Sequence, residues 1–198
     1  LWAVLHDRPQ YWACDRRHWP DGPPRKLPSP ARLSERLNTV SVMHLFELVM
    51  AEARAKMPQH LVKCIDAKPL EVGGYSKDRD AKRGRATHGM AKGYKLYAVY
   101  EGQALDAWRI GPMNESEANV ARRLIPEAAE QGEGYLLGDS LYDSNPLYTL
   151  SQQHGLQLIT PRKKPGTGLG HHRQHPARLR AIDLTDCSRT FGAPLSAQ

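Results

Sequence analysis

The chain has 198 residues, enough for one full α/β domain and a small helical annex. Its formal net charge of +7 favours a polyanionic partner, because Lys and Arg side chains displace counterions from phosphate backbones. No apolar run approaches the roughly 20 residues of a membrane-spanning helix, which excludes that class of membrane protein. Three widely spaced cysteines without a CxxC pair argue against a disulfide framework and predict a cytoplasmic location.

The first 60 residues divide into two segments of different composition. Residues 1–30 are rich in Trp, Pro and Arg without sustained periodicity, which predicts an irregular or extended arm. Residues 31–60 form a predicted helical annex, in which apolar residues recur at helical spacing from the candidate N-cap Ser34 to about Met57. One or two amphipathic helices that cover an apolar face are expected here, with a DNA contact as the alternative.

The stretch LVKCIDAKPL, residues 61–70, opens the main domain, which we expect to span residues 61–198. Its apolar run predicts a strand, and Asp66 interrupts that run. Pro69 lacks the N–H that a sheet ladder needs. The strand is therefore expected to end there or to lie at an edge.

A strongly basic stretch follows, with seven Lys or Arg against two Asp between Gly74 and Lys95. We interpret most of it as a loop that could hold a phosphate backbone beside the carboxylate of Asp66. A solvated surface loop is the alternative. The candidate DNA-binding residues are Lys77, Arg79, Lys82, Arg83, Arg85, Lys92 and Lys95.

The next elements are a hairpin and a helix. Residues 93–101 and 104–110 are rich in Tyr, Leu and Val around a glycine turn, which predicts two antiparallel strands. Asn114 with Glu117 three residues later is typical of a capping box, so a helix is expected from there to about residue 130.

The stretch YLLGDSLYDSNPLY, residues 135–148, holds the second carboxylate of interest. Its apolar start predicts a strand buried on both faces, and Asp139 follows directly after it. Ligand and catalytic groups in α/β sheets lie at or beyond the carboxyl ends of strands, although Asp139 could merely cap a turn. A helix from Asn145 to about His154 and a fifth strand in residues 156–160 complete the pattern.

Two carboxylates at strand ends have a shared chemical use. Mg²⁺ is held by one or two carboxylates together with phosphate and water, whereas two close carboxylates without a cation repel each other. Asp66 and Asp139 are therefore candidate metal ligands. The order of elements predicts a mixed α/β sheet, with an antiparallel hairpin early and a helical crossover into a parallel strand.

After Pro161 the chain is basic again, with six Lys or Arg and no acid up to residue 180. A flexible loop is the plain interpretation, and phosphate contact is the functional one. The candidate DNA-binding residues here are Arg162, Lys163, Lys164 and Arg173.

Several blocks resemble, in the right order, the DDE transposases of bacterial insertion sequences: IDAKPL, GYSKDRDAKRGR, KGYKLYAVY, YLLGDSLYDSNPLY and LITPRKK. The resemblance runs from about residue 61 to the end. It implies a ribonuclease-H-like α/β fold, with a mixed five-stranded sheet flanked by helices and a small helical N-terminal annex. It also implies that Asp66 and Asp139 are the first two carboxylates of a catalytic triad.

The chemistry implied by the resemblance is phosphodiester hydrolysis followed by strand transfer on double-stranded DNA, with element ends and target as substrates. Mg²⁺, or Mn²⁺ as an alternative, would be the cofactor. Two such ions would activate the attacking oxygen and stabilise the leaving one. A homodimer is left open.

The third acid of that family, a Glu on a helix after the fifth strand, has no counterpart here. After Ile159 the remaining acids are Asp183 and Asp186, and neither has the family's sequence context. We therefore expect a transposase core that stops short of its third acid and is impaired in catalysis. The alternatives are a catalytically inactive DNA-binding remnant and a different ribonuclease-H-like nuclease, which would need a nearby third acid.

Overall fold

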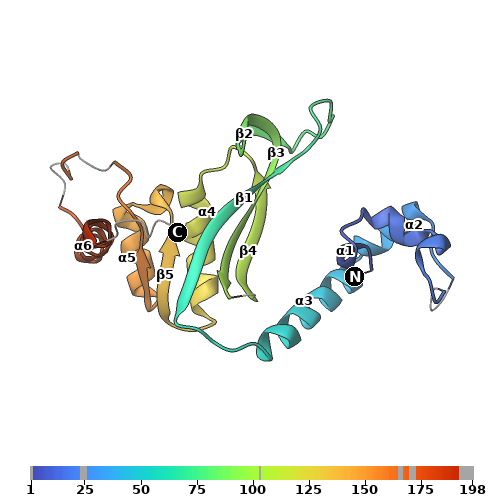
Figure 1. Cartoon of the computed structure of the whole chain (residues 1–198), viewed down its shortest axis with the longest axis horizontal. Coiled ribbons are helices and arrows are strands. Elements are labelled where there is room, and N and C mark those ends of the chain that lie inside the picture. Colours follow the sequence, from blue (N-terminus) through green and yellow to red (C-terminus); the bar gives the residue numbers. More distant parts are fainter. Residues whose placement is uncertain (1, 23–25, 103, 165–166, 170–172, 192–198) are drawn as a thin grey trace, which may run out of the picture. The chain divides into compact units, whose positions relative to one another are not determined.

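The computed structural model describes residues 2–22, 26–102, 104–164, 167–169 and 173–191. The chain divides into two compact units, Leu1–Met57 and Pro58–Gln198 (Figure 1). In the described residues, no helix combines the length and the apolarity needed to cross a membrane.

The first unit is built from short helical elements. They are α1 (Trp2–Leu5), η1 (Gln10–Cys14), η2 (Arg16–His18), α2 (Pro30–Leu37) and α3 (Val40–Ala55). Ser29, not Ser34, precedes the first long helix and accepts a hydrogen bond from the N–H of Arg32. Pro30 then takes the first helical turn, where its missing N–H costs nothing.

Aromatic stacking orders the segment that was expected to be an irregular arm. The rings of Trp2 and Trp19 stack with centroids 4.9 Å apart, and those of Trp12 and His18 with centroids 4.2 Å apart. The indole N–H of Trp2 donates to the carbonyl of His18 at 3.1 Å. These contacts supply apolar burial that periodicity alone does not reveal.

The second unit contains one mixed six-stranded sheet. Its strands are β1 (Val62–Glu71), β2 (Lys82–Ala86), β3 (Gly89–Glu101), β4 (Ala104–Pro112), β5 (Gly134–Gly138) and β6 (Leu156–Ile159). β4, β3 and β1 are antiparallel neighbours, and β5 and β6 continue the sheet parallel to β1. This order confirms the predicted ribonuclease-H-like α/β class, with β2 added where a loop was expected.

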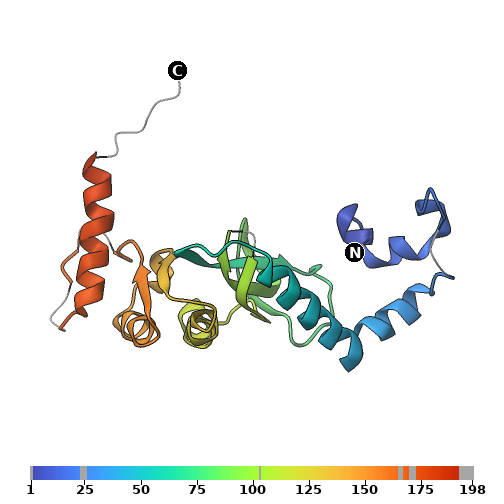
Figure 2. The same cartoon turned by 90° about the horizontal axis from the view of Figure 1, so that it is seen from below.

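The helices of the second unit are α4 (Glu117–Ala129), η3 (Ser140–Tyr142), α5 (Asn145–Gln153) and α6 (Pro176–Phe191). α4 and α5 lie side by side against one face of the sheet, and α6 packs beside β6 and α5 (Figure 2). The expected capping box is wrong, because Asn114 lies in the preceding turn and Ser116 occupies the N-cap position without a side-chain hydrogen bond.

The core lies between the sheet and these helices. Alternate strand residues such as Val99, Leu136 and Leu158 are at most 1% exposed. Residues of the other set, among them Val62, Trp108, Ile110 and Tyr135, are 42–56% exposed. Since successive side chains of a strand point to opposite faces, the sheet buries one face and leaves much of the other open.

β1 does not end at Pro69. It runs on to Glu71, with Pro69 opposite Lys95 of β3, whereas its parallel pairing with β5 stops at Ile65. Among the residues that the structure describes, residues 66–71 therefore have a neighbouring strand on one side only. The edge alternative of the sequence analysis is the one observed, because proline is tolerated where no ladder hydrogen bond is required.

A buried lysine on β1 forms ion pairs with one residue of β3 and one of β4. Lys63 Nζ lies 2.8 Å from Glu101 Oε2 and 2.6 Å from Asp106 Oδ2, and all three side chains are at most 5% exposed. Burial alone would raise the pKa of Glu101, but hydrogen bonds from Lys63 and from the backbone N–H of His60 outweigh it and lower the pKa. The positive charge of Lys63 inside this apolar strand is thus paired with two carboxylates.

Candidate metal and nucleic-acid site

Asp66 and Asp139 lie next to each other at the point where two parallel strands separate. Cys64 pairs with Leu137 and Ile65 with Gly138, so one step further along the same register brings Asp66 opposite Asp139. Adjacent strands are about 4.8 Å apart, and paired residues share a face. Both aspartates therefore lie on the open face of the sheet. Asp139 follows the end of β5, as the strand-end argument predicts, whereas the prediction is wrong for Asp66, which lies in the middle of β1.

Each of the two carboxylates has one local partner. Asp66 Oδ1 accepts the N–H of Ala67 at 2.7 Å, and Asp139 Oδ1 accepts the N–H of Leu141 at 2.8 Å and so caps η3. Both residues are exposed, and no Lys or Arg in the described part of the chain pairs with either. Their remaining oxygens are hard donors without a compensating charge, which suits a divalent cation.

A buried tyrosine lies beneath this pair. Gly138 leaves room for it, since a Cβ there would come within 3.0 Å of the side chains of both Ile65 and Tyr142. The hydroxyl of Tyr142 has no hydrogen-bond partner among the described residues. Burial raises the pKa of Tyr142, and so do the nearby carboxylates, including Asp139 and Asp66. The carboxylate pair thus lies over a close-packed, neutral phenol.

The described residues bring no third acid to the pair: they contain no group of three His, Cys, Asp or Glu side chains that could hold a metal ion. Asp183 is exposed on α6, the helix that follows β6, and it forms no metal-binding group with Asp66 and Asp139. The side chain of Asp186 lies outside the described residues. A substitute ligand at Asp183 is therefore not supported.

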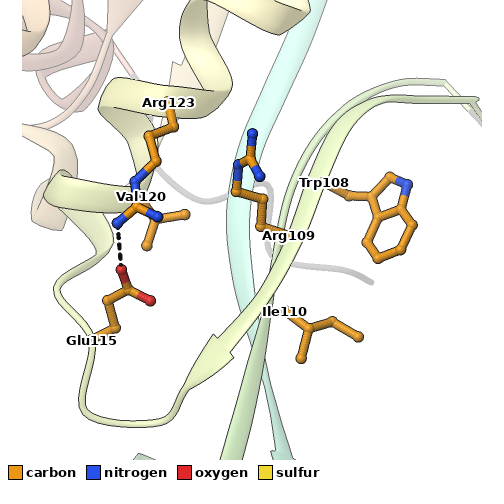
Figure 3. Close-up of a pocket in the computed structure, with 6 residues that line it drawn as sticks. All are labelled: Trp108, Arg109, Ile110, Glu115, Val120 and Arg123. Carbon is orange, nitrogen blue, oxygen red and sulfur yellow. Dashed lines mark hydrogen bonds and ion pairs between the residues drawn. The ribbon is translucent and has the colours of Figure 1, made fainter.

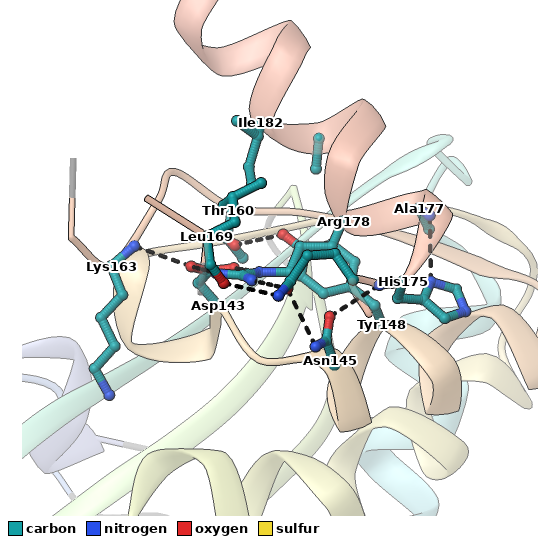
Figure 4. Close-up of polar contacts among 12 residues, drawn as sticks. Asp143, Asn145, Tyr148, Thr160, Lys163, Leu169, His175, Ala177, Arg178 and Ile182 are labelled. Atoms are coloured by element: carbon teal, nitrogen blue, oxygen red, sulfur yellow. Dashed lines mark hydrogen bonds and ion pairs between the residues drawn. The ribbon is translucent and has the colours of Figure 1, made fainter. Parts of the chain in front are cut away.

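A buried ion pair that the sequence analysis missed fixes the turn after Asp139 (Figure 4). Asp143 accepts hydrogen bonds from Arg178 Nε at 2.6 Å and from Arg178 Nη2 at 2.7 Å, and a third from the N–H of Lys163 at 3.0 Å. Nearby, Asn145 Oδ1 accepts the N–H of His175. Burial would raise the pKa of Asp143, but these donors outweigh it and lower the pKa. The turn is thereby joined to α6.

Replacing Arg178 with Met is expected to destabilise the domain by about 1.5–3 kcal/mol, the range for hydrogen bonds to a charged group, because Asp143 loses its bidentate partner while buried. Urea denaturation of wild type and variant measures this difference. Arg180→Met, at an exposed position on the same helix, is the matched control and should change stability by less than about 0.5 kcal/mol.

The same ion pair should make stability depend on pH. A carboxyl whose folded-state pKa is lowered contributes stability that is fully present above the unfolded value of about 3.9 and is lost as the pH falls toward the folded value. The difference between wild type and Arg178→Met should therefore shrink below about pH 4. A difference that stays constant down to acid pH would contradict the assignment.

The first basic stretch does not form one uniform patch. Lys82, Arg83, Arg85 and Lys92 lie on the β2–β3 hairpin, and Lys77 and Arg79 are exposed before it. Lys95 differs: its side chain is 11% exposed and Nζ lies 2.7 Å from Glu117 Oε1. Lys95 thus takes part in a partly buried ion pair, and phosphate contact by this residue stays a prediction.

The second basic stretch lines a cavity of about 210 Å³ beside Asp143 and Arg178. Arg162, Lys163 and Lys164 contribute to its wall, and Arg162 Nη2 also donates to the carbonyl of Thr167. Arg173 is exposed before α6. Phosphate contact by these four residues stays a prediction.

A larger cavity of about 420 Å³ lies between β4 and α4 (Figure 3). It is lined by Trp108, Arg109, Ile110, Glu115, Val120 and Arg123. Its charged groups are already paired, Arg123 with Glu115 at 2.8 Å and Arg109 with Glu127. Neither Asp66 nor Asp139 lines it. The cavity therefore carries no unpaired carboxylate for a metal among the residues that line it, and the exposed pair of Asp66 and Asp139 is the better candidate.

Comparison with known proteins identifies the family of this chain. A family model described as "Transposase DDE domain" matches residues 57–191. The chain belongs to the transposase DDE domain family. The resemblance found in the sequence is thereby confirmed for this DDE domain. No curated protein matches the chain.

Two solved transposase structures are similar to the DDE domain at low identity. One is the piggyBac transposase synaptic complex with hairpin DNA, 15% identical with a TM-score of 0.45, over 78% of this chain and 33% of that one. The other is the Mos1 transposase paired-end complex with left transposon end, 12% identical with a TM-score of 0.35, over 57% of this chain and 38% of that one. The chain thus spans 33% of the first of these relatives and 38% of the second.

Proposed function

We propose that this chain supplies the metal-holding and DNA-handling core of a DDE transposase, with Asp66 and Asp139 as catalytic carboxylates. The observation that supports the proposal is the register of β1 and β5, whose last pair, Ile65 with Gly138, directly precedes both aspartates. The substrate would be double-stranded DNA in the cytoplasm.

Asp66 and Asp139 would hold Mg²⁺, with Mn²⁺ as an alternative. When bound, the ion supplies activation of an attacking oxygen and charge stabilisation at the phosphate. The residues of this chain contribute the rest. The N–H groups of Ala67 and Leu141 each hold one carboxylate oxygen, which leaves the other oxygen of each pointing to solvent. The Asp143–Arg178 pair keeps the turn that carries Asp139 in place.

The second candidate is a catalytically inactive DNA-binding remnant. It is favoured by the missing third acid, since the described residues give the metal two carboxylates only. Two ligands support weak binding of Mg²⁺, which usually keeps several waters, but they hold a two-ion arrangement poorly.

The experiment that tests the proposal combines two measurements on the wild-type chain. Calorimetric titration with Mn²⁺ should show weak, saturable binding, and supercoiled plasmid with Mg²⁺ should be bound yet nicked only slowly. Absence of any divalent-metal binding would contradict the proposed metal site and favour the remnant. Robust nicking by the chain alone would instead require a third ligand and overturn the two-carboxylate description.

A further inference from the structure

One face of the β2–β3 hairpin carries three positively charged side chains. Arg83 pairs with Lys92 and Arg85 pairs with Met90 across the two strands. Paired residues share a face of an antiparallel ribbon, and so do alternate residues along one strand. These four side chains therefore form a single face that contains three cations and no acid.

The opposite face of the ribbon consists of small residues except for Lys82, which pairs with Gly93 and whose Nζ donates to the carbonyl of Arg79 at 2.7 Å. Gly84 pairs with Ala91, and Ala86 with Gly89. A Cβ at Gly84 would collide with the backbone carbonyl of Met113. At Gly84 this face is therefore packed against neighbouring backbone, whereas the space around Gly89 at the tip is open. The cationic face points away from the Met113 backbone. Arg83 and Arg85 are exposed, and neither has an acidic partner in the described part of the chain.

The cationic face of the ribbon lies on the same side of the sheet as the two catalytic aspartates. β3 runs from the hairpin to Ala98, which pairs with Asp66, and its one register shift lies beyond that point, between Val99 and Tyr100. Lys92 is an even number of residues from Ala98, so both point to one face. At about 3.3 Å per residue, Lys92 lies ~20 Å from Ala98, and Met90 ~26 Å.

We propose that residues 82–93 form a duplex-binding arm, in which Arg83, Arg85 and Lys92 contact DNA phosphates about 6–8 base pairs from the catalytic carboxylates, at ~3.4 Å per pair. This rests on the proposed function, because it takes Asp66 and Asp139 as the reacting end. A two-stranded ribbon fits the major groove, which is about 12 Å wide. Lys92 Nζ donates one hydrogen bond to the carbonyl of Ser76 at 2.7 Å, which leaves two N–H groups for phosphate.

The salt dependence of DNA binding tests the arm. Fluorescence anisotropy with a 30-base-pair duplex between 50 and 200 mM salt is measured for wild type and for Arg83→Ala/Arg85→Ala. Each lost phosphate contact should reduce the slope of log K against log salt by about 0.9, so the double variant should lose about 2. The same loss should appear on duplexes of unrelated sequence, and Arg83→Lys/Arg85→Lys should restore the slope, since it restores both charges.

The matched control is Arg122→Ala/Arg180→Ala, which removes two exposed positive charges on α4 and α6. Its slope should stay at the wild-type value. Equal slopes for wild type and the ribbon variant, equal losses in the ribbon and control variants, or no duplex binding by the wild type would overturn the arm.

Metal binding separates this inference from the proposed function. Calorimetry with Mn²⁺ should give the same result for the ribbon variant as for wild type. If the ribbon variant binds metal normally and its salt slope equals that of wild type, the duplex-binding arm is contradicted and the proposed catalytic site is not. If the ribbon variant has a reduced slope but the wild-type chain binds no metal, the proposed catalytic site is contradicted and the arm is supported.

Discussion

Asp66→Asn and Asp139→Asn are each expected to abolish divalent-metal binding while leaving affinity for duplex DNA unchanged or up to about fivefold higher. The loss should be complete because the pair supplies the only two carboxylates that the described residues bring together there. A neutral amide oxygen is a much poorer ligand for Mg²⁺ or Mn²⁺ than a carboxylate.

The DNA affinity should not fall because each variant removes a negative charge close to the proposed phosphate position. Asn is also nearly isosteric with Asp. Its side-chain oxygen can still accept the N–H of Ala67 at position 66, or that of Leu141 at position 139, so the local fold is kept. Metal binding and DNA binding should therefore separate in these variants.

Titration calorimetry with Mn²⁺ and anisotropy with a labelled duplex measure the two effects. Asp183→Asn is the matched control, since it changes an exposed aspartate on α6 that does not approach the pair, and its metal binding should equal that of wild type. Weaker DNA binding in both site variants would show that Asp66 and Asp139 are structural. Loss of metal binding in Asp183→Asn would show that Asp183 is a metal ligand after all.

Lys63→Met should destabilise the domain by about 3–5 kcal/mol, the range for breaking a buried ion pair by removal of one partner. Both carboxylates that contact Lys63 Nζ, those of Glu101 and Asp106, would be left buried without it. Methionine fills most of the vacated volume, so the cost is electrostatic rather than a cavity. The midpoint of urea denaturation at an unchanged m-value reports the loss.

Two further variants identify the cause of that loss. Lys68→Met, at an exposed position of the same strand, should shift the free energy of unfolding by no more than about 0.5 kcal/mol. Lys63→Met/Glu101→Gln/Asp106→Asn removes all three charges and should recover most of the stability, since replacing a whole buried charge cluster is often neutral. A triple variant as unstable as the single one would mean that Lys63 acts through packing alone. That variant also yields an answer if Lys63→Met fails to fold.

The sequence was most informative where local rules and the sheet agree. The apolar runs before Asp66 and Asp139 predict two strands, and the register of β1 and β5 brings the two acids together where the pairing of these strands stops. Only Asp139 follows a strand end, because β1 continues past Asp66 to Glu71. The hairpin around Gly102 and the helix from Asn145 follow from turn and cap residues in the same way. In these cases a few neighbouring residues contain the whole signal.

Pairs that are distant in sequence could not be predicted from local rules. Lys63 meets Glu101 and Asp106 about forty residues later, and Asp143 meets Arg178 thirty-five residues later. One signal was available: a lysine inside an apolar strand requires a buried acid, so Lys63 predicts a partner without naming it. The identity of the partner depends on strand order, which comes only from the fold.

The basic stretch after β1 shows the reverse case, in which composition conceals structure. Its charge and glycines indicate a loop, yet Lys82–Ala86 pairs with the start of β3 because the glycines permit close backbone approach. Composition also groups Lys95 with its basic neighbours. The side chain of Lys95 lies on the covered face of β3, where Glu117 of α4 pairs with it.

The one-sided stretch of β1 has a consequence for how copies of this domain meet. The N–H of Val72 reaches β3, whereas the carbonyl of Leu61 reaches β5, so by alternation the backbone polar groups of Ala67 and Pro69 face the unpaired edge. Ala67 gives its N–H to the carboxylate of Asp66, and Pro69 has none. An incoming strand would find no free donor at either position. The acid proposed for catalysis thus also protects an exposed edge against the edge-to-edge aggregation to which open sheets are prone.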